Sequence, residues 1–349
     1  MKKNSYLCNV FSYDREKMRK HRTIPIFVPE MACPCRCVYC NQFVISGQQT
    51  LPTDEEIIDT IETHLSTMQG DIEIELGFFG GTFTGIAKGE QLRLMRLVQP
   101  YIERGRIVGM RCSTRPDRIE SEWLEVLKSE GMKTIELGVQ SMRDEVLMAA
   151  GRGYGAQTVI DAAKKIRDAG LNLGMQMMIG LPNDTKEGAL ETAQKIIECG
   201  ANNTRIYPTL VLEDTVLAKR WRAGSYKALS IEEAVDWTAP VLELMETSGL
   251  EVLRVGLHPT EGFISGEDYL AGPFHVAFRL MVQTEIWRKR FEKLQGGKSV
   301  KIWVGKGMVN AAAGYGGKNK KQLLKRYERV NFREVDDLSG YEYGYEEQR

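Results

Sequence analysis

Residues 33–40 read CPCRCVYC, and they follow the short apolar run 24–28 (IPIFV). Four of the chain's seven cysteines fall within this stretch. Three of them, Cys33, Cys37 and Cys40, form a C-x3-C-x2-C pattern. Thiolates packed this closely suit zinc or an iron–sulfur cluster. Structural zinc usually has four ligands, and Cys35 would have to be the fourth, because the four histidines are scattered. On the cluster interpretation Cys35 is a bystander.

Disulfide bonds are a poor explanation of these cysteines. Their number is odd, and the chain has 349 residues. The polar N-terminus lacks the apolar core of a secretory signal. No run approaches the roughly 18 apolar residues of a membrane helix. We therefore expect a cytoplasmic protein that does not cross a membrane.

Strand-like apolar runs alternate with amphipathic helical segments from residue 24 to residue 255. Strands are expected at 24–28, 72–79, 107–114, 134–139, 173–179, 203–207 and 250–255. Helices are expected at 92–102, 121–129, 143–150, 156–169, 185–199 and 231–248, and another begins after the capping box at Thr53. This alternation predicts a parallel sheet with helical crossovers. The fold class is α/β, a partial (β/α)6-type barrel.

Polar and glycine-rich motifs follow most of the predicted strands. They are the cysteine loop, 80–82 (GGT), 113–115 (STR), 140–141 (QS), 180–182 (GLP) and 207–209 (YPT). Chemistry in such folds gathers at the carboxyl ends of the strands. We therefore expect these motifs to meet in one site. Met175, Met177 and Met178 are interpreted as core residues of a buried strand.

The cysteine pattern, with an aromatic residue before its third cysteine, resembles the radical S-adenosylmethionine (SAM) superfamily. The motifs GGTFT (80–84), STRPD (113–117), ELGVQS (136–141), RG (152–153), MMIGLP (177–182) and IYPTLV (206–211) occur in that order. This series resembles the radical SAM half of the elongator subunit Elp3 family over roughly residues 24–257. The expected fold is therefore a radical SAM barrel.

The resemblance implies that Cys33, Cys37 and Cys40 bind a [4Fe–4S] cluster whose fourth iron chelates SAM. The reduced cluster would then cleave SAM to a 5′-deoxyadenosyl radical. The implied SAM-binding residues are Tyr39, Gly80, Gly81, Thr82, Ser113, Arg115, Gln140, Arg152, Gln176 and Tyr207. Gln140 and Gln176 are amides on apolar strands, and SAM hydroxyls can supply the partners that buried amides need. Arg115 has the alternative of an ion pair with Asp117 or Glu120.

The sequence departs from the Elp3 pattern in two respects. Eukaryotic Elp3 has a wider gap between its first two cluster cysteines, whereas the x3 spacing here is that of the general superfamily. Elp3 also carries an acetyltransferase domain, and residues 258–349 are too few to hold one. The loop 314–317 (GYGG) is a weak candidate for an acyl-CoA phosphate loop and is better interpreted as a turn.

Four regions follow from these patterns: a basic N-terminal arm (1–22), the barrel (23–257), a basic C-terminal extension (258–334) and an acidic tail (335–349). In the α+β extension we expect a helix at 276–294, strands near 299–304 and 308–313, and a basic helix at 320–329. The tail is expected to be disordered in part.

Basic residues concentrate at both ends of a chain whose net charge is zero. The arm holds seven Lys and Arg against two acidic residues, and residues 296–334 hold ten against two. A face containing Lys318, Lys320, Lys321, Lys325, Arg326, Tyr327 and Arg329 would suit RNA phosphates. The alternative is a solvated helix.

Together with the Elp3 resemblance, these charges favour an enzyme, a transferase or oxidoreductase, that modifies a tRNA base. It would need an electron donor such as ferredoxin or flavodoxin. One alternative is a radical SAM enzyme acting on a small molecule, in the manner of coproporphyrinogen dehydrogenase. Another is a non-catalytic metal-binding interaction protein.

Overall fold

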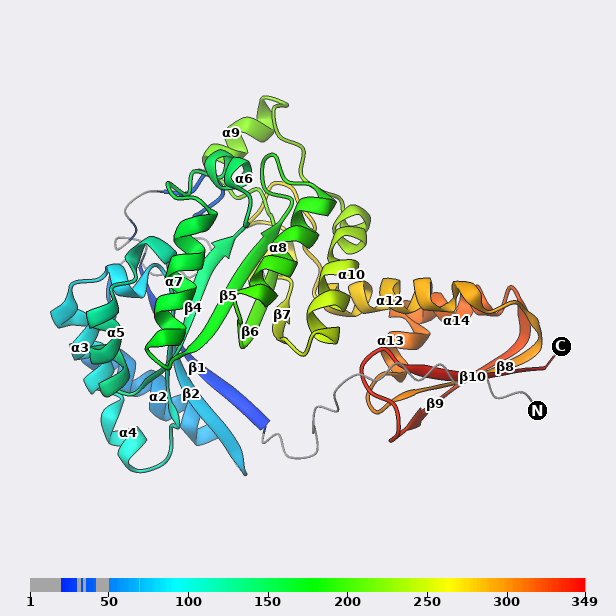
Figure 1. The fold of residues 1–349 in the computed structure, drawn as a ribbon, viewed down its shortest axis with the longest axis horizontal. Helices are drawn as coiled ribbons and strands as arrows, with labels where there is room; N and C mark the ends of the chain where they lie inside the picture. Colours follow the sequence, from blue (N-terminus) through cyan, green and yellow to red (C-terminus); the bar gives the residue numbers. More distant parts are fainter. Residues whose placement is uncertain (1–19, 30–32, 34–35, 42–49, 69, 349) are drawn as a thin grey trace.

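Seven parallel strands form a curled half-barrel (Figure 1). The computed structural model describes residues 20–29, 33, 36–41, 50–68 and 70–348. The strands follow the order of the chain across the sheet: β1 (Lys20–Val28), β2 (Ile72–Gly80), β3 (Gly109–Thr114), β4 (Met132–Gln140), β5 (Asn172–Ile179), β6 (Asn203–Pro208) and β7 (Glu251–Val255). The α/β partial barrel expected from the sequence is confirmed, with seven strands. Pro25 is accommodated because β1 is an edge strand.

Helices follow the strands along the chain, and most of them cover the outer face of the sheet (Figure 1). They are α2 (Asp54–Thr67), α3 (Lys88–Arg96), α4 (Gln99–Glu103), α5 (Ser121–Ser129), α6 (Asp144–Ala149), α7 (Ala156–Asp168), α8 (Lys186–Glu198), α9 (Val216–Arg222), α10 (Ile231–Thr247) and α11 (Glu261–Ser265). The short 3-10 turns η3 (Phe83–Gly85) and η4 (Pro116–Arg118) follow β2 and β3. The predicted capping box is present, since the Thr53 side chain accepts from the Glu56 N–H and the Glu56 carboxylate accepts from the Thr53 N–H. The helix expected at 92–102 is divided into α3 and α4, and α9 was not predicted.

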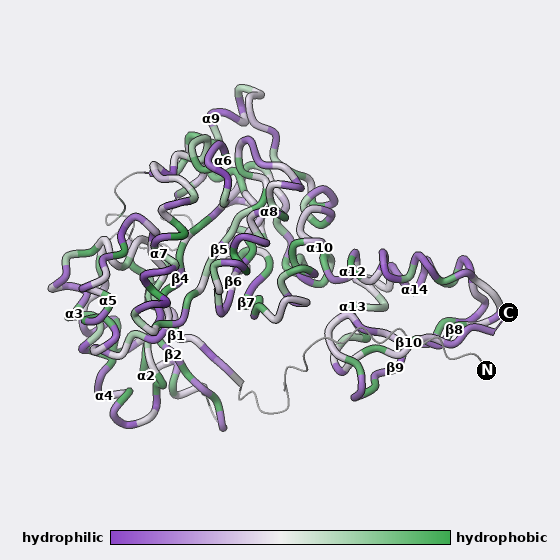
Figure 2. The backbone as a smooth tube through the Cα atoms, in the orientation of Figure 1, coloured by the Kyte–Doolittle hydropathy of each residue, from purple (hydrophilic) through white to green (hydrophobic). Residues whose placement is uncertain are grey.

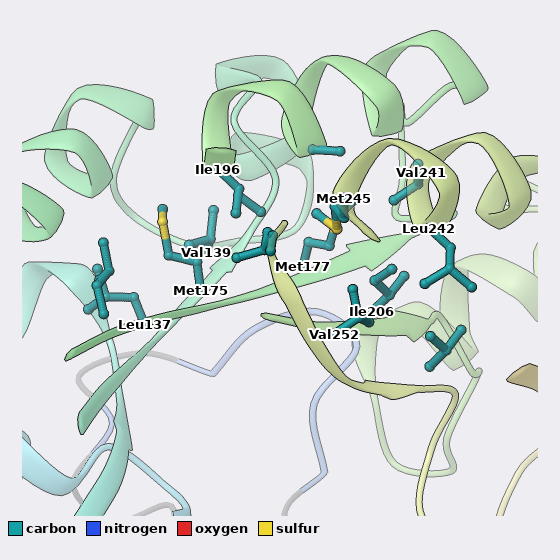
Figure 3. Close-up of a cluster of buried hydrophobic side chains, with 14 of the residues drawn as sticks. Leu137, Val139, Met175, Met177, Ile196, Ile206, Val241, Leu242, Met245 and Val252 are labelled. Atoms are coloured by element: carbon teal, nitrogen blue, oxygen red, sulfur yellow. The ribbon is translucent and has the colours of Figure 1, made fainter. Parts of the chain in front are cut away.

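The core fills the space between the sheet and its helices. Figure 3 shows side chains of β4, β5 and β6 pointing toward α8 and α10. Met175 and Met177 are fully buried there, which confirms their interpretation as core residues. One face of these strands therefore packs against helices. The polar residues on alternate positions face the interior of the half-barrel.

A second, three-stranded sheet follows the half-barrel. Its strands are β8 (Gly297–Gly305), β9 (Tyr327–Val335) and β10 (Tyr343–Gln348), in the order β10-β8-β9. The helices are α12 (Phe278–Arg290), α13 (Val309–Ala313) and α14 (Lys318–Leu323), with 3-10 turns η5 (Phe291–Lys293) and η6 (Tyr315–Gly317). Strand β8 is parallel to β9 and antiparallel to β10. We call residues 278–348 the C-terminal unit.

Three local predictions for this unit are wrong. Residues 309–313 are helical where a strand was expected, and the helix expected at 320–329 ends at Leu323 and gives way to β9. Residues 343–348 form a strand, although the tail was expected to be disordered in part. The reason is tertiary: Tyr343 packs edge-on against Trp287 and Phe291 of α12 and η5. Such contacts are invisible to local propensity.

The predicted basic face is also rearranged. Tyr327 is buried, and its hydroxyl donates to Glu347. Arg326 donates to the carbonyls of Leu294 and Phe291, so it holds the turn before β8 together. Lys318, Lys320, Lys321, Lys325 and Arg329 remain exposed.

Ion pairs attach the C-terminal unit to the half-barrel. Arg290 of α12 pairs with Glu243 of α10 at 2.5 Å, and Arg279 pairs with Glu246 at 2.7 Å. Of the predicted basic arm, residues 1–19 lie outside the described part of the chain, and Cys8 and Cys35 lie outside it as well. Among the described residues, no helix combines the length and the apolar character needed to cross a membrane.

Candidate active site

Backbone hydrogen bonds anchor the cysteine loop at two places. The Val38 N–H donates to the carbonyl of Ala150 after α6 (3.0 Å), and the Val38 carbonyl accepts from Leu217 of α9 (2.7 Å). The Val38 side chain packs with Val211, Leu217 and Tyr226. The loop is therefore held between two helix termini by a buried valine.

One cavity of about 350 Å³ lies between this loop and the carboxyl ends of β2 to β5. It is lined by Cys33, Arg36, Cys37, Tyr39, Cys40, Gly80, Gly81, Thr82, Ser113, Thr114, Arg115, Gly138, Gln140, Arg152 and Gln176. The three predicted cluster cysteines and nine of the ten predicted SAM-binding residues are thus brought together. The volume is in the range of small-molecule sites.

Tyr207 is the predicted residue that does not line this cavity. It lies on β6 beside Arg205, and burial raises the pKa of its hydroxyl, although Arg205 lowers it. Three lining residues were not predicted: Arg36, Thr114 and Gly138. Thr114 follows the predicted Ser113 in the chain. Gly138 lies two residues before the predicted Gln140, in the bulge described below. Arg36 gave no distinguishing signal within its loop.

Two arginine side chains approach the thiol of Cys37. Arg152 donates from Nη1 to its Sγ at 3.1 Å, and Arg115 approaches the same sulfur at 3.9 Å. The Sγ of Cys33 is 3.1 Å from the Thr82 hydroxyl. Hydrogen bonds to cysteine sulfur are one means by which proteins tune iron–sulfur clusters. The donors on the cavity wall therefore fit such a cluster.

Within the described residues, no three His, Cys, Asp or Glu side chains converge closely enough to hold one metal ion. Cys35, the fourth ligand that the zinc alternative needs, lies outside the described residues. A cluster makes a different demand, because each cysteine binds a separate iron.

Arg115 is buried, but its guanidinium is largely engaged within the protein. Its Nε and Nη2 donate to the Asp117 carboxylate at 2.9 and 3.0 Å, and Nη2 also donates to the Arg152 carbonyl at 2.5 Å. The alternative of an Asp117 ion pair is therefore present, between the buried Arg115 and the exposed Asp117. The same guanidinium also faces Cys37.

The backbone is unusual where β4 ends at the cavity. The pairing of β4 with β5 shifts register between Gly138 and Gln140, and Gln140 adopts a positive φ of 69°. A side chain at Gly138 would meet the Gln140 amide at 3.0 Å and Arg152 at 3.5 Å. A left-handed glutamine is uncommon, and such conformations cluster at functional sites. The bulge presents Gln140 to the cavity, and a side chain at Gly138 would press on the Gln140 amide.

A buried charge network lies beneath the cavity, and little in the sequence pointed to it. Glu136 of β4 is 1% exposed and pairs with Arg111 (2.8 Å) and Arg205 (2.8 Å). Burial alone would raise the pKa of Glu136, but Arg205 and Arg111 hold it below its ordinary value. We call these three residues the barrel network. The only sequence signal was three charged residues on otherwise apolar strands.

The barrel network reaches the cavity through an amide. Gln176 donates from Nε2 to Glu136 at 2.7 Å and to the Ser113 hydroxyl at 3.0 Å. Both amide hydrogens are then engaged, so the carbonyl oxygen is the group of Gln176 that can accept a hydrogen bond from a ligand. Glu136 thereby fixes the orientation of a cavity-lining amide.

A half-barrel whose strand ends and three-cysteine loop enclose one cavity is the arrangement of a SAM-dependent iron–sulfur enzyme. The family model described as the radical SAM superfamily matches residues 31–196, and a radical SAM C-terminal domain model matches residues 201–288. The chain belongs to the radical SAM superfamily. Its cofactors are a [4Fe–4S] cluster and SAM.

Three proteins show where within the superfamily the similarity lies. Protein YhcC of Escherichia coli K12 is 25% identical over 223 residues, 62% of this chain and 69% of YhcC. A tRNA uridine(34) acetyltransferase of Dehalococcoides mccartyi is 25% identical over 238 residues, 58% of this chain and 52% of the relative. The archaeal Elp3 of Methanocaldococcus infernus has a similar fold, with a TM-score of 0.62 and 20% identity over 78% of this chain and 64% of Elp3. The chain therefore spans less than two thirds of both the acetyltransferase and the solved Elp3.

Proposed function

We propose that this radical SAM enzyme modifies a base in RNA, with tRNA as its substrate. The observation that carries the chemistry is the one cavity that three cysteines share with the ends of four strands. The choice of RNA is supported by similarity to a protein named as a tRNA uridine(34) acetyltransferase and by the excess of Lys and Arg in residues 296–334.

In this proposal Cys33, Cys37 and Cys40 hold the cluster, which when reduced supplies the electron that cleaves SAM to a 5′-deoxyadenosyl radical. Arg152 positions the central cysteine, because it donates to Cys37 Sγ and also to the Gly138 carbonyl at 2.5 Å. The buried Val38 holds the loop in place from the opposite side. The protein thereby fixes its thiols before any ligand binds.

The strand ends provide the contacts for SAM. The Gln176 carbonyl would be available to accept a hydrogen bond from a hydroxyl of SAM, and Gln140 would face SAM from the bulge of β4. Gly80, Gly81 and Gly138 allow close approach because they lack a Cβ. Tyr39 lies beside Arg152, which donates to its hydroxyl at 3.3 Å. Asp117 occupies two donor groups of Arg115, so Arg115 steadies the cysteine loop rather than clamping the SAM carboxylate.

The test is anaerobic reconstitution with iron and sulfide, followed by reduction and addition of SAM. We expect 5′-deoxyadenosine, and we expect mass spectrometry of nucleosides from added bulk tRNA to show a changed base. Cys37→Ala should abolish both. The matched control is Cys199→Ala. Cys199 caps the C-terminus of α8 and does not line the cavity, so this substitution should leave both 5′-deoxyadenosine formation and base modification unchanged.

Two outcomes would count against the proposal. If Cys37→Ala still cleaves SAM, the cysteine assignment is wrong. If the wild-type protein cleaves SAM but no tRNA nucleoside changes and tRNA does not stimulate cleavage, the substrate is not tRNA, and the small-molecule alternative is favoured.

A further inference from the structure

A Gly-x-x-Gly loop, GYGG at 314–317, joins α13 to α14 in the C-terminal unit. The two helices connect β8 to β9, which are parallel neighbours in the sheet. The loop thus belongs to a compact β-α-α-β unit and lies outside the cavity described above. Neither the cluster nor SAM requires it.

The ends of this loop are tightly built. Gly314 has φ +88°, and a Cβ there would lie 2.9 Å from the Asn319 nitrogen and 2.9 Å from the Thr284 methyl group. Asn319 is 1% exposed and donates to the carbonyls of Thr284 (2.9 Å) and Ala312 (3.2 Å). The Tyr315 N–H donates to the Thr284 hydroxyl at 2.8 Å. The loop is therefore fixed to α12 at its start and to α14 at its end.

The middle of the loop is open. Tyr315 is 42% exposed, and a Cβ built on Gly316 (φ +60°) would meet no atom within 4 Å. A Cβ on Gly317 (φ +73°) would meet only the Lys321 side chain, at 3.9 Å. A ligand can therefore approach this backbone closely, which residues with larger side chains would hinder.

Positive charge is concentrated along the chain on both sides of the loop, and the nearby Glu292, which lies with Gln322 and Lys325 around one hollow, is paired with Arg288 at 2.7 Å. The sequence contains no Asp or Glu between Glu292 and Glu328. Lys318, Lys320 and Lys321 of α14 and Lys325 after it are exposed, and α14 is coloured as largely hydrophilic in Figure 2. A fixed glycine loop, an exposed aromatic ring and a run of exposed lysines suit a polyanion that also carries bases.

We propose that the GYGG loop binds the sugar–phosphate backbone of a single-stranded RNA segment, with Tyr315 against a base and the α14 lysines against phosphates. KH domains use a Gly-x-x-Gly loop to clamp RNA backbone, so the loop has a known physical counterpart. The inference rests on the proposed RNA substrate and assigns the surface that holds it.

The position of the loop suits delivery of RNA to the cavity. The Tyr315 hydroxyl lies 3.4 Å from His275 Nε2, and the two rings meet edge to face. His275 belongs to the segment between β7 and α12, which starts at the carboxyl end of β7. That sheet edge also carries the cavity, so one continuous segment of chain links the two sites.

The test places negative charge in the loop without changing its shape. Gly316→Asp/Gly317→Asp adds two carboxylates at positions with room for a side chain, and Gly316→Asn/Gly317→Asn is the matched neutral control. Asp and Asn are the residues that best tolerate a positive φ. The probe is a fluorescein-labelled unstructured RNA oligonucleotide bound to full-length protein, measured by anisotropy across a salt titration. We expect the Asp pair to weaken binding about tenfold or more relative to the Asn pair at low salt.

Equal dissociation constants for the Asp and Asn pairs would overturn the inference. So would displacement of the RNA by coenzyme A at micromolar concentration, because it would make the loop an acyl-CoA site. RNA-independent SAM cleavage should be the same in both pairs, which shows that the barrel is intact. If tRNA proves not to be modified while the Asp pair still loses RNA binding, the proposed function fails and this inference stands. If tRNA is modified but the Asp pair and the Asn pair bind RNA equally, the proposed function stands and this inference fails.

Discussion

The half-barrel and the C-terminal unit use charged residues in opposite ways. In the half-barrel, Glu136 is almost fully buried and lies within 2.8 Å of both Arg111 and Arg205. In the C-terminal unit, Lys318, Lys320 and Lys321 are exposed along a short helix. The first set is already paired inside the protein. The second set faces solvent.

Charged residues therefore have two different roles in this chain. Buried pairs interact strongly at short range and hold groups in one geometry, so the barrel network can orient the Gln176 amide at the cavity. Exposed cations act over about a Debye length and are screened by salt. They are suited to attracting a large anion rather than to positioning a reacting atom.

The largest expected effect is on folding stability. Glu136→Gln removes the carboxylate charge that Arg111 and Arg205 share, although Arg111 keeps Glu75 at 3.2 Å, and we expect the free energy of unfolding to fall by about 3 kcal/mol. Glu328→Gln, at an exposed position of β9, should change it by less than about 0.5 kcal/mol. Urea denaturation measures both. Equal losses of unfolding free energy in the two variants would contradict the difference between the buried charges of the half-barrel and the exposed charges of the C-terminal unit.

A smaller effect is expected on catalysis when an arginine of the site is shortened. Arg152→Lys keeps the charge but cannot donate at once to Cys37, Gly138 and Tyr154, so we expect SAM cleavage to fall about tenfold, with a lower iron content. Arg326→Lys is the control in the C-terminal unit, where the arginine also bridges carbonyls. It should leave cleavage unchanged. If both variants cleave SAM normally, Arg152 has no positioning role.

The last effect depends on pH and concerns a barrel carboxylate that accepts hydrogen bonds from the backbone. Asp184 accepts from the Gly180 and Thr185 N–H groups, but burial raises its pKa from 3.8 to about 6. The folded state then binds this proton more tightly than the unfolded state. The contribution of Asp184 to stability is therefore full below pH 3.8 and is lost as the pH rises through about 6.

The unfolding free energy of the wild type minus that of Asp184→Asn measures this contribution. The difference should change by no more than about 1.4 kcal/mol per pH unit. Urea titrations at pH 4.5 to 7 should show the difference falling as pH rises. The paired Glu136 has the opposite sign, since its pKa is lowered and its contribution is lost only in acid. A flat difference would show that Asp184 is solvated like a surface group.

The sequence predicted the half-barrel well because its signals are local. Apolar runs mark each strand, and the polar motifs lie close after the strand ends. Helix α5 has the bounds expected for it. The sequence predicted the C-terminal unit poorly. Residues 320–329 have helical composition, but β9 forms because Val330 packs in the core beside β8. Tyr327 was expected on a binding face and is instead buried.

By itself, the sequence determined the order of the seven strands of the half-barrel, the class of cofactor and the residues that gather at one edge of the sheet. Parallel strands place their carboxyl ends together, so position along the chain was enough. Only the tertiary structure decided which charges are paired. Arg111, Glu136 and Arg205 come from three different strands, and nothing local shows that their side chains meet. The same holds for the GYGG loop, whose ends are fixed by Thr284 from another helix while its centre remains open.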